Sequence, residues 1–279
     1  MRAILIKDGK GPIENLYLGE APEPVLKHGQ VMVKIKAFGL NRMDILQRNG
    51  NYAVPAGASD ILGVEFSGTV SSLGEGTTKF KVGDEGAYAE YIVVSETHLL
   101  PKPSHLSWVE AASIPEVFLT GTILWEMKEG ESVLVHAAAS GLGLPLSKCS
   151  CEGAKTVIAT ASTRDKLDWL SHWNMNIESM ARDGRMTNAR PLEWCFNLGA
   201  LLFKRLRIQG STLRSRTAQY QADLINKFTG DLLGMITGKD GQGPIKTYIH
   251  KVYSWKDIQD AHRDMEGNQT IGKLIVVVD

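Results

Sequence analysis

The stretch VLVHAAASGLGLPL (residues 133–146) has the layout of a nucleotide-binding turn. Its apolar start predicts a buried strand, and the small residues that follow predict a tight loop leading into a helix. Residues 138–143 match A-x-x-G-x-G, a variant of the dinucleotide-binding fingerprint in which alanine replaces the first glycine. Pro145 falls in the first helical turn, where its missing N–H costs little. The stretch therefore predicts the start of a βαβ unit.

Each part of this loop has a role in holding a pyrophosphate. Gly141 would let the backbone approach the phosphates, and Gly143 would let the helix pack closely on the strand. The helix N-terminus adds unsatisfied N–H groups and the positive end of the helix dipole. A glycine-rich turn is often only tight packing, but KTVIATA (155–161) follows as a second strand in βαβ order, which favours a cofactor site. The predicted contacts are Ala139, Ser140, Gly141, Leu142 and Gly143.

The end of this second strand indicates which nucleotide is bound. An NAD site places an acid about 20 residues past the glycines, where it holds the ribose 2′-hydroxyl. Here the strand ends in Ser162 and Thr163, and Arg164 and Lys166 follow, which suits a 2′-phosphate. Asp165 is the competing signal, and we interpret it as the capping-box partner of Ser162. Ser162, Thr163 and Lys166 are therefore predicted to bind the cofactor and to favour NADPH over NADH.

The remaining sequence divides into β-rich ends and an α/β middle. Runs rich in β-branched and apolar residues predict strands near both ends: MRAILI (1–6), VMVKIKA (31–37), GVEFSGTVSSLG (63–74), YAEYIVV (88–94), IKTYIHKVY (245–253) and IGKLIVVV (271–278). Helices are predicted over VFLTGTILWEM (117–127) and TRDKLDWLS (163–171). We predict one β-rich domain from residues 1–115 and 245–279, and an NADP-binding α/β domain over 116–244.

Two capping signals mark further helices. Ser107 and Glu110 fit a capping box that opens a short helix. Ser254 to Asp257 caps a helix that is predicted to stop before Gly267.

Composition excludes several classes of function. Lys and Arg number 31 and Asp and Glu number 31, so no overall field attracts nucleic acid or an anionic membrane. No segment approaches the ~20 apolar residues of a membrane span, and MRAILIKDGK is too short an apolar run for a signal peptide. We expect a cytoplasmic protein that binds neither nucleic acid nor membrane.

The cysteines give no basis for a metal site. Cys149, Cys151 and Cys195 are too few and too scattered for a disulfide scaffold. Cys149 and Cys151 could be half of a metal site, but no further cluster of Cys or His supplies the other ligands. We interpret both as packing residues on the helix that follows the glycine loop, and we predict no metal.

Seven segments, in order along the whole chain, resemble the medium-chain dehydrogenases/reductases, and most of all their zinc-free NADPH:quinone oxidoreductases. They are GLNRMDILQRNGNY (39–52), ILGVEFSGTV (61–70), KVGD (81–84), AASIPEVFLTGT (111–122), HAAASGLG (136–143), LLFKRLRIQGSTLRSR (201–216) and TIGKLIVVVD (270–279). The resemblance implies an α/β fold with a GroES-like β-rich domain and a Rossmann-type doubly wound parallel sheet. It also implies a homodimer that transfers hydride from NADPH to small-molecule quinones or α,β-unsaturated carbonyls, as enoyl reductase domains do.

The resemblance also suggests site residues. Zinc-bearing relatives carry a Cys and a His where this chain has Asn41 and Val64, and their four-Cys lobe is absent, which implies no zinc. Asn41 and Tyr52 match positions that line the catalytic cleft, where each donor aimed at a developing oxyanion contributes ~3 kcal/mol. The alternatives are that Asn41 caps the next helix and that Tyr52 packs in a turn. Thr120 matches a position near the cofactor, or its hydroxyl bonds its own helical turn.

The chain departs from the family pattern after residues 163–171. The family continues there with a third strand, a helix and a fourth strand, whereas HWNMNIESMARDGR (172–185) resembles the helix after that fourth strand. MTNARPLEWCFN (186–197) replaces most of the next family strand. The Rossmann-type sheet is thus expected to lack several strands, which leaves an edge of SVLVHA (132–137) exposed unless LRIQGS (206–211) pairs with it. The alternative function is a catalytically impaired remnant that binds NADP(H) weakly or only associates with full-length relatives.

Overall fold

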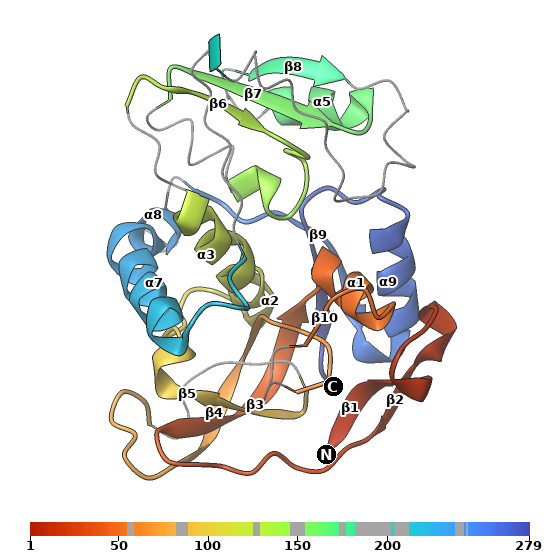
Figure 1. Ribbon diagram of the computed structural model, residues 1–279, viewed down its shortest axis with the longest axis vertical. Helices are drawn as coiled ribbons and strands as arrows, with labels where there is room; N and C mark the ends of the chain where they lie inside the picture. The colour runs from red at the N-terminus through yellow and green to blue at the C-terminus, as the bar shows by residue number, and fades with distance from the viewer. Residues whose placement is uncertain are drawn as a thin grey trace.

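A computed structural model describes residues 1–54, 59–81, 89–124, 129–145, 154–172, 177–181, 202–203, 212–237, 243 and 245–279. Figure 1 shows two parts, a β-rich part that contains both termini and an α/β part above it. The β-rich part contains the strands β1 (Arg2–Ile6), β2 (Leu16–Glu20), β3 (Gln30–Gly39), β4 (Phe66–Leu73), β5 (Tyr91–Ser95), β9 (Ile249–Ser254) and β10 (Lys273–Val277). The α/β part contains β6 (Ser132–Val135), β7 (Thr156–Ala161) and β8 (Ile177–Ala181).

The helices connect and cover these sheets. They are α1 (Arg42–Arg48), α2 (Trp108–Ala112), α3 (Pro115–Leu124), α5 (Arg164–Ser171), α7 (Ala218–Asp231), α8 (Leu233–Thr237) and α9 (Ile258–Glu266). Short 3-10 turns are η1 (Lys7–Gly9), η2 (Ile13–Asn15), η3 (Glu96–His98) and η4 (Trp255–Asp257). None of these helices combines the length and the apolar composition needed to cross a bilayer, within the part of the chain that is described.

β3 organises the β-rich part because its residues alternate between core and surface. Val31, Val33 and Ile35 are fully or almost fully buried, as the alternation in VMVKIKA predicts. The mixed sheet runs β4-β3-β10-β9, with β5 also pairing with β3, and β9 and β10 are parallel. Strands from both chain ends therefore share one sheet, as the sequence predicts.

The helix between β9 and β10 closes one side of this core. In α9 the residues Ile258, Ala261, His262 and Met265 are buried, at the spacing of one helix face. Ser254 caps the 3-10 turn that leads into α9, which ends before Gly267, so the predicted start and stop are confirmed.

The capping box at the start of α2 is also confirmed. The Ser107 Oγ accepts the Glu110 N–H at 3.2 Å, and the Glu110 carboxylate accepts the Ser107 N–H at 2.8 Å. These bonds satisfy backbone N–H groups that have no partner inside the helix. Such an N-cap interaction typically stabilises a helix by about 1 kcal/mol. α2 then positions α3, whose first turn reaches the candidate site.

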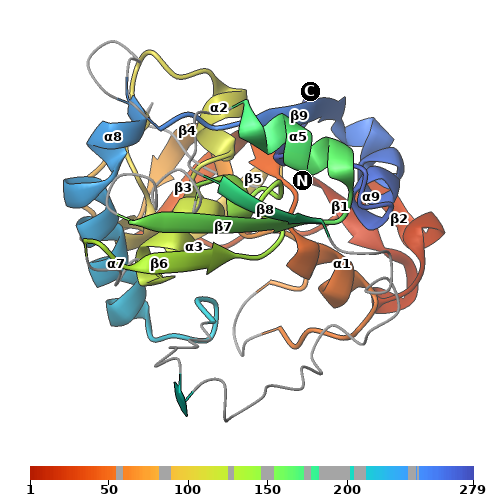
Figure 2. The same cartoon turned by 90° about the horizontal axis from the view of Figure 1, so that it is seen from above.

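The α/β part is a parallel sheet in the order β6-β7-β8, with α5 packed against β7 and β8 (Figure 2). Its core contains Val135, Val157, Ala159, Leu167 and Leu170. The predicted α/β class, with a β-rich part and a Rossmann-type parallel sheet, is confirmed. The predicted domain boundaries near residues 115 and 245 stay a prediction.

One predicted helix is wrong. IESMA (177–181), inside the segment expected to be helical, forms β8 and pairs in parallel with β7 from Val157–Ile177 to Ala161–Ala181. The physical reason is that β7 presents an unpaired edge on this side, and a strand satisfies its backbone groups whereas a helix would not.

The other edge of this sheet agrees with the expected loss of strands. Within the described part of the chain, β6 pairs with β7 alone, and the Leu134 side chain is 52% exposed. LRIQGS (206–211), which could have covered this edge, lies outside the described residues.

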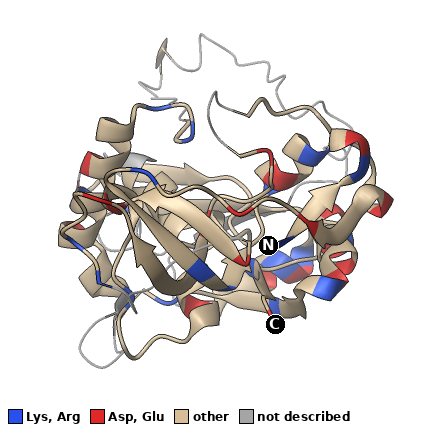
Figure 3. Cartoon of the chain, turned by 90° about the horizontal axis from the view of Figure 1, so that it is seen from below, with Lys and Arg blue, Asp and Glu red and all other residues tan. Residues whose placement is uncertain are grey.

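α7 was not predicted. It buries Ala222, Leu224, Ile225 and Phe228 on one face, and the Phe228 ring lies 6.3 Å from that of Phe118 in α3. Figure 1 shows α7 and α8 beside α3, so this helix pair supports the first turn of α3. Acidic and basic positions are interspersed along the ribbon in Figure 3, in keeping with the neutral overall charge.

Candidate active site

The predicted phosphate loop follows β6 as a tight turn. The Ser140 N–H donates to the Ala137 carbonyl at 2.8 Å, and the Ser140 Oγ accepts the Gly143 N–H at 3.0 Å. A Cβ at Gly143 would lie 2.2 Å from the Ala137 carbonyl oxygen, a distance that no side chain tolerates. Gly143 therefore has the close-packing role that the fingerprint assigns to it.

The middle of this loop has free donors and joins the β-rich part. No other described residue accepts a hydrogen bond from the N–H of Gly141 or Leu142. Ala139 accepts the Gly272 N–H at 2.8 Å, and Ser140 forms a bridge with Gly272, just before β10. A loop with free N–H groups at a helix start fits a phosphate group.

Directly after this bridge, Lys273 forms a buried ion pair with Glu65. The side chains are 4% and 0% exposed. The Lys273 Nζ also donates to the Leu40 carbonyl at 3.0 Å and to the Asn41 Oδ1 at 2.8 Å. Burying either charge without its partner costs several kcal/mol, so this network holds its members in one arrangement.

Asn41 is part of this network. Its Nδ2 donates to the Glu65 Oε1 at 2.8 Å, and its Oδ1 accepts from Lys273. Asn41 also precedes α1, and its N–H donates to the Asp44 Oδ2 at 2.7 Å, so it begins the helix as the alternative interpretation held. An amide has two Nδ2 hydrogens, and Glu65 uses one of them. The second can serve as a donor to a bound oxygen.

Tyr52 lies beside a cation. The Arg214 guanidinium carbon is 5.7 Å from the centroid of the Tyr52 ring, within the range of a cation–π contact. The Arg214 Nη1 donates to the Gln47 Oε1 of α1 at 2.6 Å, which fixes the guanidinium. Tyr52 is partly buried, so its placement depends on Arg214 as well as on the turn that carries it.

The N-cap residue of α5, the helix that follows β7, differs from the prediction. Thr163, and not Ser162, is the N-cap of α5, and its Oγ1 accepts the Lys166 N–H at 3.4 Å. The predicted capping box between Ser162 and Asp165 is therefore wrong, because the helix begins one residue later. Ser162 and Thr163 are both exposed at the strand end, and their contact with a cofactor stays a prediction.

Two cations meet near this strand end. The Lys166 Nζ donates to the Asn268 carbonyl, and the Arg42 Nη2 donates to the Asn268 Oδ1, both at 2.5 Å. Burial lowers the pKa of Lys166, and the positive charge of Arg42 lowers it further. A pair of converging cations beside the second strand suits a phosphate group.

Thr120 lies partly buried in α3. Its hydroxyl makes no hydrogen bond to any other residue that the structure describes. The bond within the helical turn that we considered for Thr120 is made instead by Thr122, whose Oγ1 donates to the Phe118 carbonyl at 2.8 Å.

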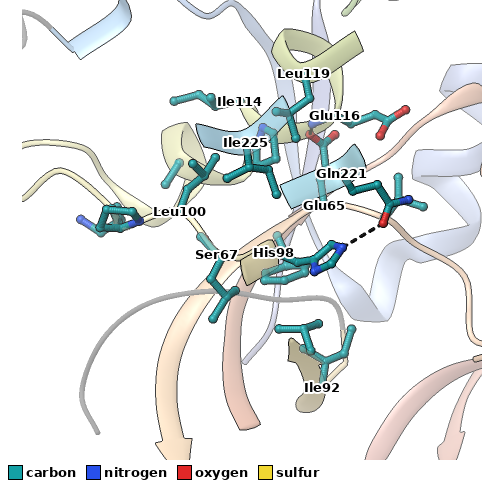
Figure 4. A pocket seen from close by; sticks show the side chains of 18 of the residues that line it. Glu65, Ser67, Ile92, His98, Leu100, Ile114, Glu116, Leu119, Gln221 and Ile225 are labelled. Carbon is teal, nitrogen blue, oxygen red and sulfur yellow. Dashed lines mark hydrogen bonds between the residues drawn. The ribbon is translucent and has the colours of Figure 1, made fainter. Parts of the chain in front are cut away.

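A cavity of about 590 Å³ lies next to this network. Figure 4 shows it between the β-rich sheet, α3 and α7, with Glu65 and Glu116 at one end. The walls are mostly apolar, and they include Ile92, Leu99, Leu100, Ile114, Leu119, Leu224 and Ile225. This volume and composition suit a small, largely apolar ligand.

Metal ligands are not clustered in the described ranges, where no group of three or more His, Cys, Asp or Glu side chains could hold an ion. Asn41 and Val64 occupy the positions at which zinc-bearing relatives have ligands. Cys149, Cys151 and Cys195 lie outside the described residues, and the absence of zinc stays a prediction.

Four charged residues of this region were not predicted from sequence: Arg42, Glu65, Glu116 and Lys273. Glu65 and Lys273 did carry a signal, because each is a charge within an apolar run, ILGV or LIVVV, and buried charges require partners. Arg42 and Glu116 are charges at helix starts, where a solvated position is the ordinary expectation.

Two family models match the chain. The alcohol dehydrogenase GroES-like domain matches residues 27–85, and the zinc-binding dehydrogenase model matches residues 175–276. Together they span more than half of the sequence.

Curated relatives and solved structures agree with these matches. The synaptic vesicle membrane protein VAT-1 homolog-like of Mus musculus is 34% identical over 175 residues, which are 58% of this chain and 42% of the relative. The quinone oxidoreductase of Lama guanicoe is 29% identical over 177 residues, which are 59% of this chain and 54% of that protein. The chain thus spans about half the length of these relatives.

The crystal structure of Escherichia coli quinone oxidoreductase complexed with NADPH has the same fold. It superposes with a TM-score of 0.81 at 23% identity and covers 99% of this chain and 100% of that one. The motifs, the two family models and the fold agree, and the chain belongs to the medium-chain dehydrogenase/reductase family.

Proposed function

We propose that this protein is a cytoplasmic, zinc-independent NADPH-dependent oxidoreductase that reduces quinones or α,β-unsaturated carbonyls and acts as a homodimer. One observation carries the proposal. Lys273 follows directly on the bridge to the phosphate loop, and the same side chain holds the Asn41 amide. The cofactor loop and the candidate donor to the substrate are thereby fixed to one buried ion pair.

The fit of a dinucleotide rests on the loop and on the end of β7. Gly141 and Leu142 lie at a helix start and their N–H groups donate to no other described residue, which suits a pyrophosphate. Lys166 and Arg42 would contact a 2′-phosphate, which is the group that distinguishes NADPH from NADH. Two solved structures of this fold, from E. coli and from a mycobacterium, are described as complexes with NADPH.

When bound, NADPH supplies a hydride. The residues of this chain polarise the acceptor, because a carbonyl that gains hydride develops negative charge on its oxygen. The second Nδ2 hydrogen of Asn41 and the Tyr52 hydroxyl are the candidate donors to that oxygen. Lys273 and Glu65 keep the Asn41 amide oriented, which matters because a misplacement of about 1 Å can reduce a rate a hundredfold.

A second function has support from the edge of the sheet. β6 carries the phosphate loop, yet within the described residues it has a neighbour on one side only, and Leu134 is 52% exposed. Family members place the nicotinamide crevice beyond this edge. The alternative is therefore a catalytically impaired remnant that binds NADP(H) weakly or only associates with full-length relatives.

Binding and turnover of the purified chain distinguish the two functions. Titration with NADPH and NADH by nucleotide fluorescence should give tighter binding of NADPH, and NADPH should then reduce 9,10-phenanthrenequinone. A chain that binds NADPH but turns over far more slowly than a version restored with a relative's missing strands is the remnant. Failure to bind either nucleotide would contradict the reductase and the weakly binding remnant, and would leave only a remnant that associates with full-length relatives.

A further inference from the structure

Glu116 is a partly buried carboxyl at the start of α3 that no interaction described so far uses. Its N–H donates to the Glu65 Oε2 at 3.0 Å, which places its side chain next to the buried ion pair. The side chain lines the 590 Å³ cavity. Its carboxyl group makes no hydrogen bond to any other residue in the described part of the chain, and Figure 4 shows it close to Glu65.

The charges around Glu116 come from four separate parts of the chain. Glu65 precedes β4, Asp44 is in α1, Lys273 is in β10 and Arg214 precedes α7. Burial raises the pKa of Glu116 to about 7, and the negative charge of Glu65 and then that of Asp44 act in the same direction. Lys273 and Arg214 oppose this shift in part. The carboxyl group is therefore protonated in a large fraction of molecules at neutral pH.

Several other polar groups of the cavity already have partners. His98 Nε2 bonds the Gln221 Oε1 at 2.9 Å, the pair drawn in Figure 4. The Lys102 Nζ donates to two backbone carbonyls, and the Ser67 Oγ donates to the Trp108 carbonyl. A ligand that enters this cavity therefore meets mostly apolar walls, the Arg214 guanidinium, which donates to the Gln47 Oε1 at 2.6 Å, and the Glu116 carboxyl, which has no hydrogen-bond partner among the described residues.

We propose that the cavity binds a neutral, largely apolar carbonyl compound and that the protonated carboxyl of Glu116 donates a hydrogen bond to its oxygen. An ammonium ligand fits less well, because the positive charges of Arg214 and Lys273 already act on Glu116 and would repel a further cation. A carboxylate ligand would face Glu65 and Glu116 in the same confined space. The ligand class rests on the proposed function, and Glu116 is a further donor, on the wall of a cavity whose lining does not include Asn41 or Tyr52.

Loss of the Glu116 proton removes this donor and adds a second negative charge beside Glu65. Ligand binding should therefore weaken as the pH rises through 7. Between pH 6 and pH 8 the protonated fraction of a group with a pKa of about 7 falls about tenfold, and affinity should fall by a similar factor. Glutamine is isosteric with glutamate and donates through its amide, so Glu116→Gln should bind at both pH values about as tightly as the unmodified chain does at pH 6.

The test uses 9,10-phenanthrenequinone as the probe and the full chain without any nucleotide. Quenching of tryptophan fluorescence gives the dissociation constant at pH 6 and pH 8, and thermal unfolding checks that each variant is folded. Glu23→Gln, an exposed acid in a loop, is the matched control and should keep the tenfold pH dependence. Glu116→Ala should lose the pH dependence and bind more weakly at pH 6.

Two results would overturn the proposal: equal affinity of the unmodified chain at pH 6 and pH 8, or a pH dependence that persists in Glu116→Gln. Benzylamine provides a further check, since tighter binding of this cation at pH 8 than at pH 6, lost in Glu116→Gln, would show that the cavity takes cations instead. Because no nucleotide and no turnover are involved, a chain that fails to use NADPH can still pass this test.

Discussion

Lys273 and Glu65 lie 208 residues apart in the sequence and form an ion pair in which the two side chains are 4% and 0% exposed. The pair connects the first residue of β10 with the residue before β4. Since Asn41 bonds both members, the network couples the packing of the β-rich part to the candidate catalytic amide.

Removing one member of this pair should destabilise the protein strongly. Lys273→Met leaves the Glu65 carboxylate buried without its cation, and we expect a loss of about 3–5 kcal/mol in the free energy of unfolding at pH 7. Urea denaturation measures it. The double variant with Glu65→Leu should recover much of this loss, because it removes both charges together. A double variant as unstable as Lys273→Met would contradict the assignment.

His262 should make the protein sensitive to acid. Its ring is 2% exposed and its Nδ1 lies 2.9 Å from the Arg48 Nη1, so it accepts a hydrogen bond and must be neutral. Burial, and next the charge of Arg48, lower its pKa to about 3. The unfolded chain binds a proton below pH 6.5 whereas the folded one does not, so stability is lost as the pH falls from 6.5 towards 3.

The expected slope from this histidine approaches roughly 1.4 kcal/mol per pH unit in that window. The free energy of unfolding, measured by urea denaturation at pH 7, 6 and 5, gives this slope. His262→Asn should flatten the slope, while the exposed His172→Asn serves as the control and should leave it unchanged. Equal slopes in all three proteins would show that His262 is not the responsible group.

Glu116 should affect stability in the opposite direction. Its folded pKa of about 7 lies above the ordinary 4.5, so the folded chain binds the extra proton and loses stability as the pH rises from 4.5 through 7. Glu116→Gln should therefore be more stable than the unmodified protein at pH 8, by about 1–2 kcal/mol after allowance for partial exposure, and similar to it at pH 4.5. Urea denaturation at these two pH values gives the difference in the free energy of unfolding between the variant and the unmodified protein. A difference that is the same at both pH values would argue against a raised pKa of Glu116.

Arg42 and Lys166 should determine the preference for NADPH. Replacing either by alanine removes a cation that converges on Asn268, and we expect NADPH affinity to fall about tenfold while NADH affinity stays nearly constant. Lys227→Ala is the control, because Lys227 is a 59% exposed cation in α7 that pairs with Asp231 and is not among the predicted cofactor contacts. Nucleotide fluorescence titration gives the affinities. An equal loss for both nucleotides would place the two cations away from the 2′-phosphate.

Local patterns were sufficient to predict much of the fold. Alternating apolar residues placed β3, and the serine and glutamate of the capping box placed α2, because both signals depend on near neighbours in the chain. The prediction for IESMA was wrong because it rested on the resemblance of residues 172–185 to a family helix, whereas the open edge of β7 decided the outcome.

The candidate site was less predictable for a related reason. The glycine loop is contiguous, so its turn could be inferred from spacing alone. The partners of Asn41 are 24 and 232 residues away in the chain, and no local pattern relates such positions. Glu116, whose carboxyl has no hydrogen-bond partner among the described residues, could not be predicted either, because its importance depends on a cavity that α7 encloses from a distant part of the sequence.

The bridge between Ser140 and Gly272 has a consequence for motion. Enzymes with a cleft between two parts commonly open and close it by rotation about a few connecting residues. Here one main-chain contact fastens the loop after β6 to the residue that precedes Lys273, and the buried charge of Lys273 anchors that point in turn. A rotation of the upper sheet that preserves this contact would pivot about it, so that the far rim of the cleft would move while the phosphate loop and Asn41 keep a constant separation.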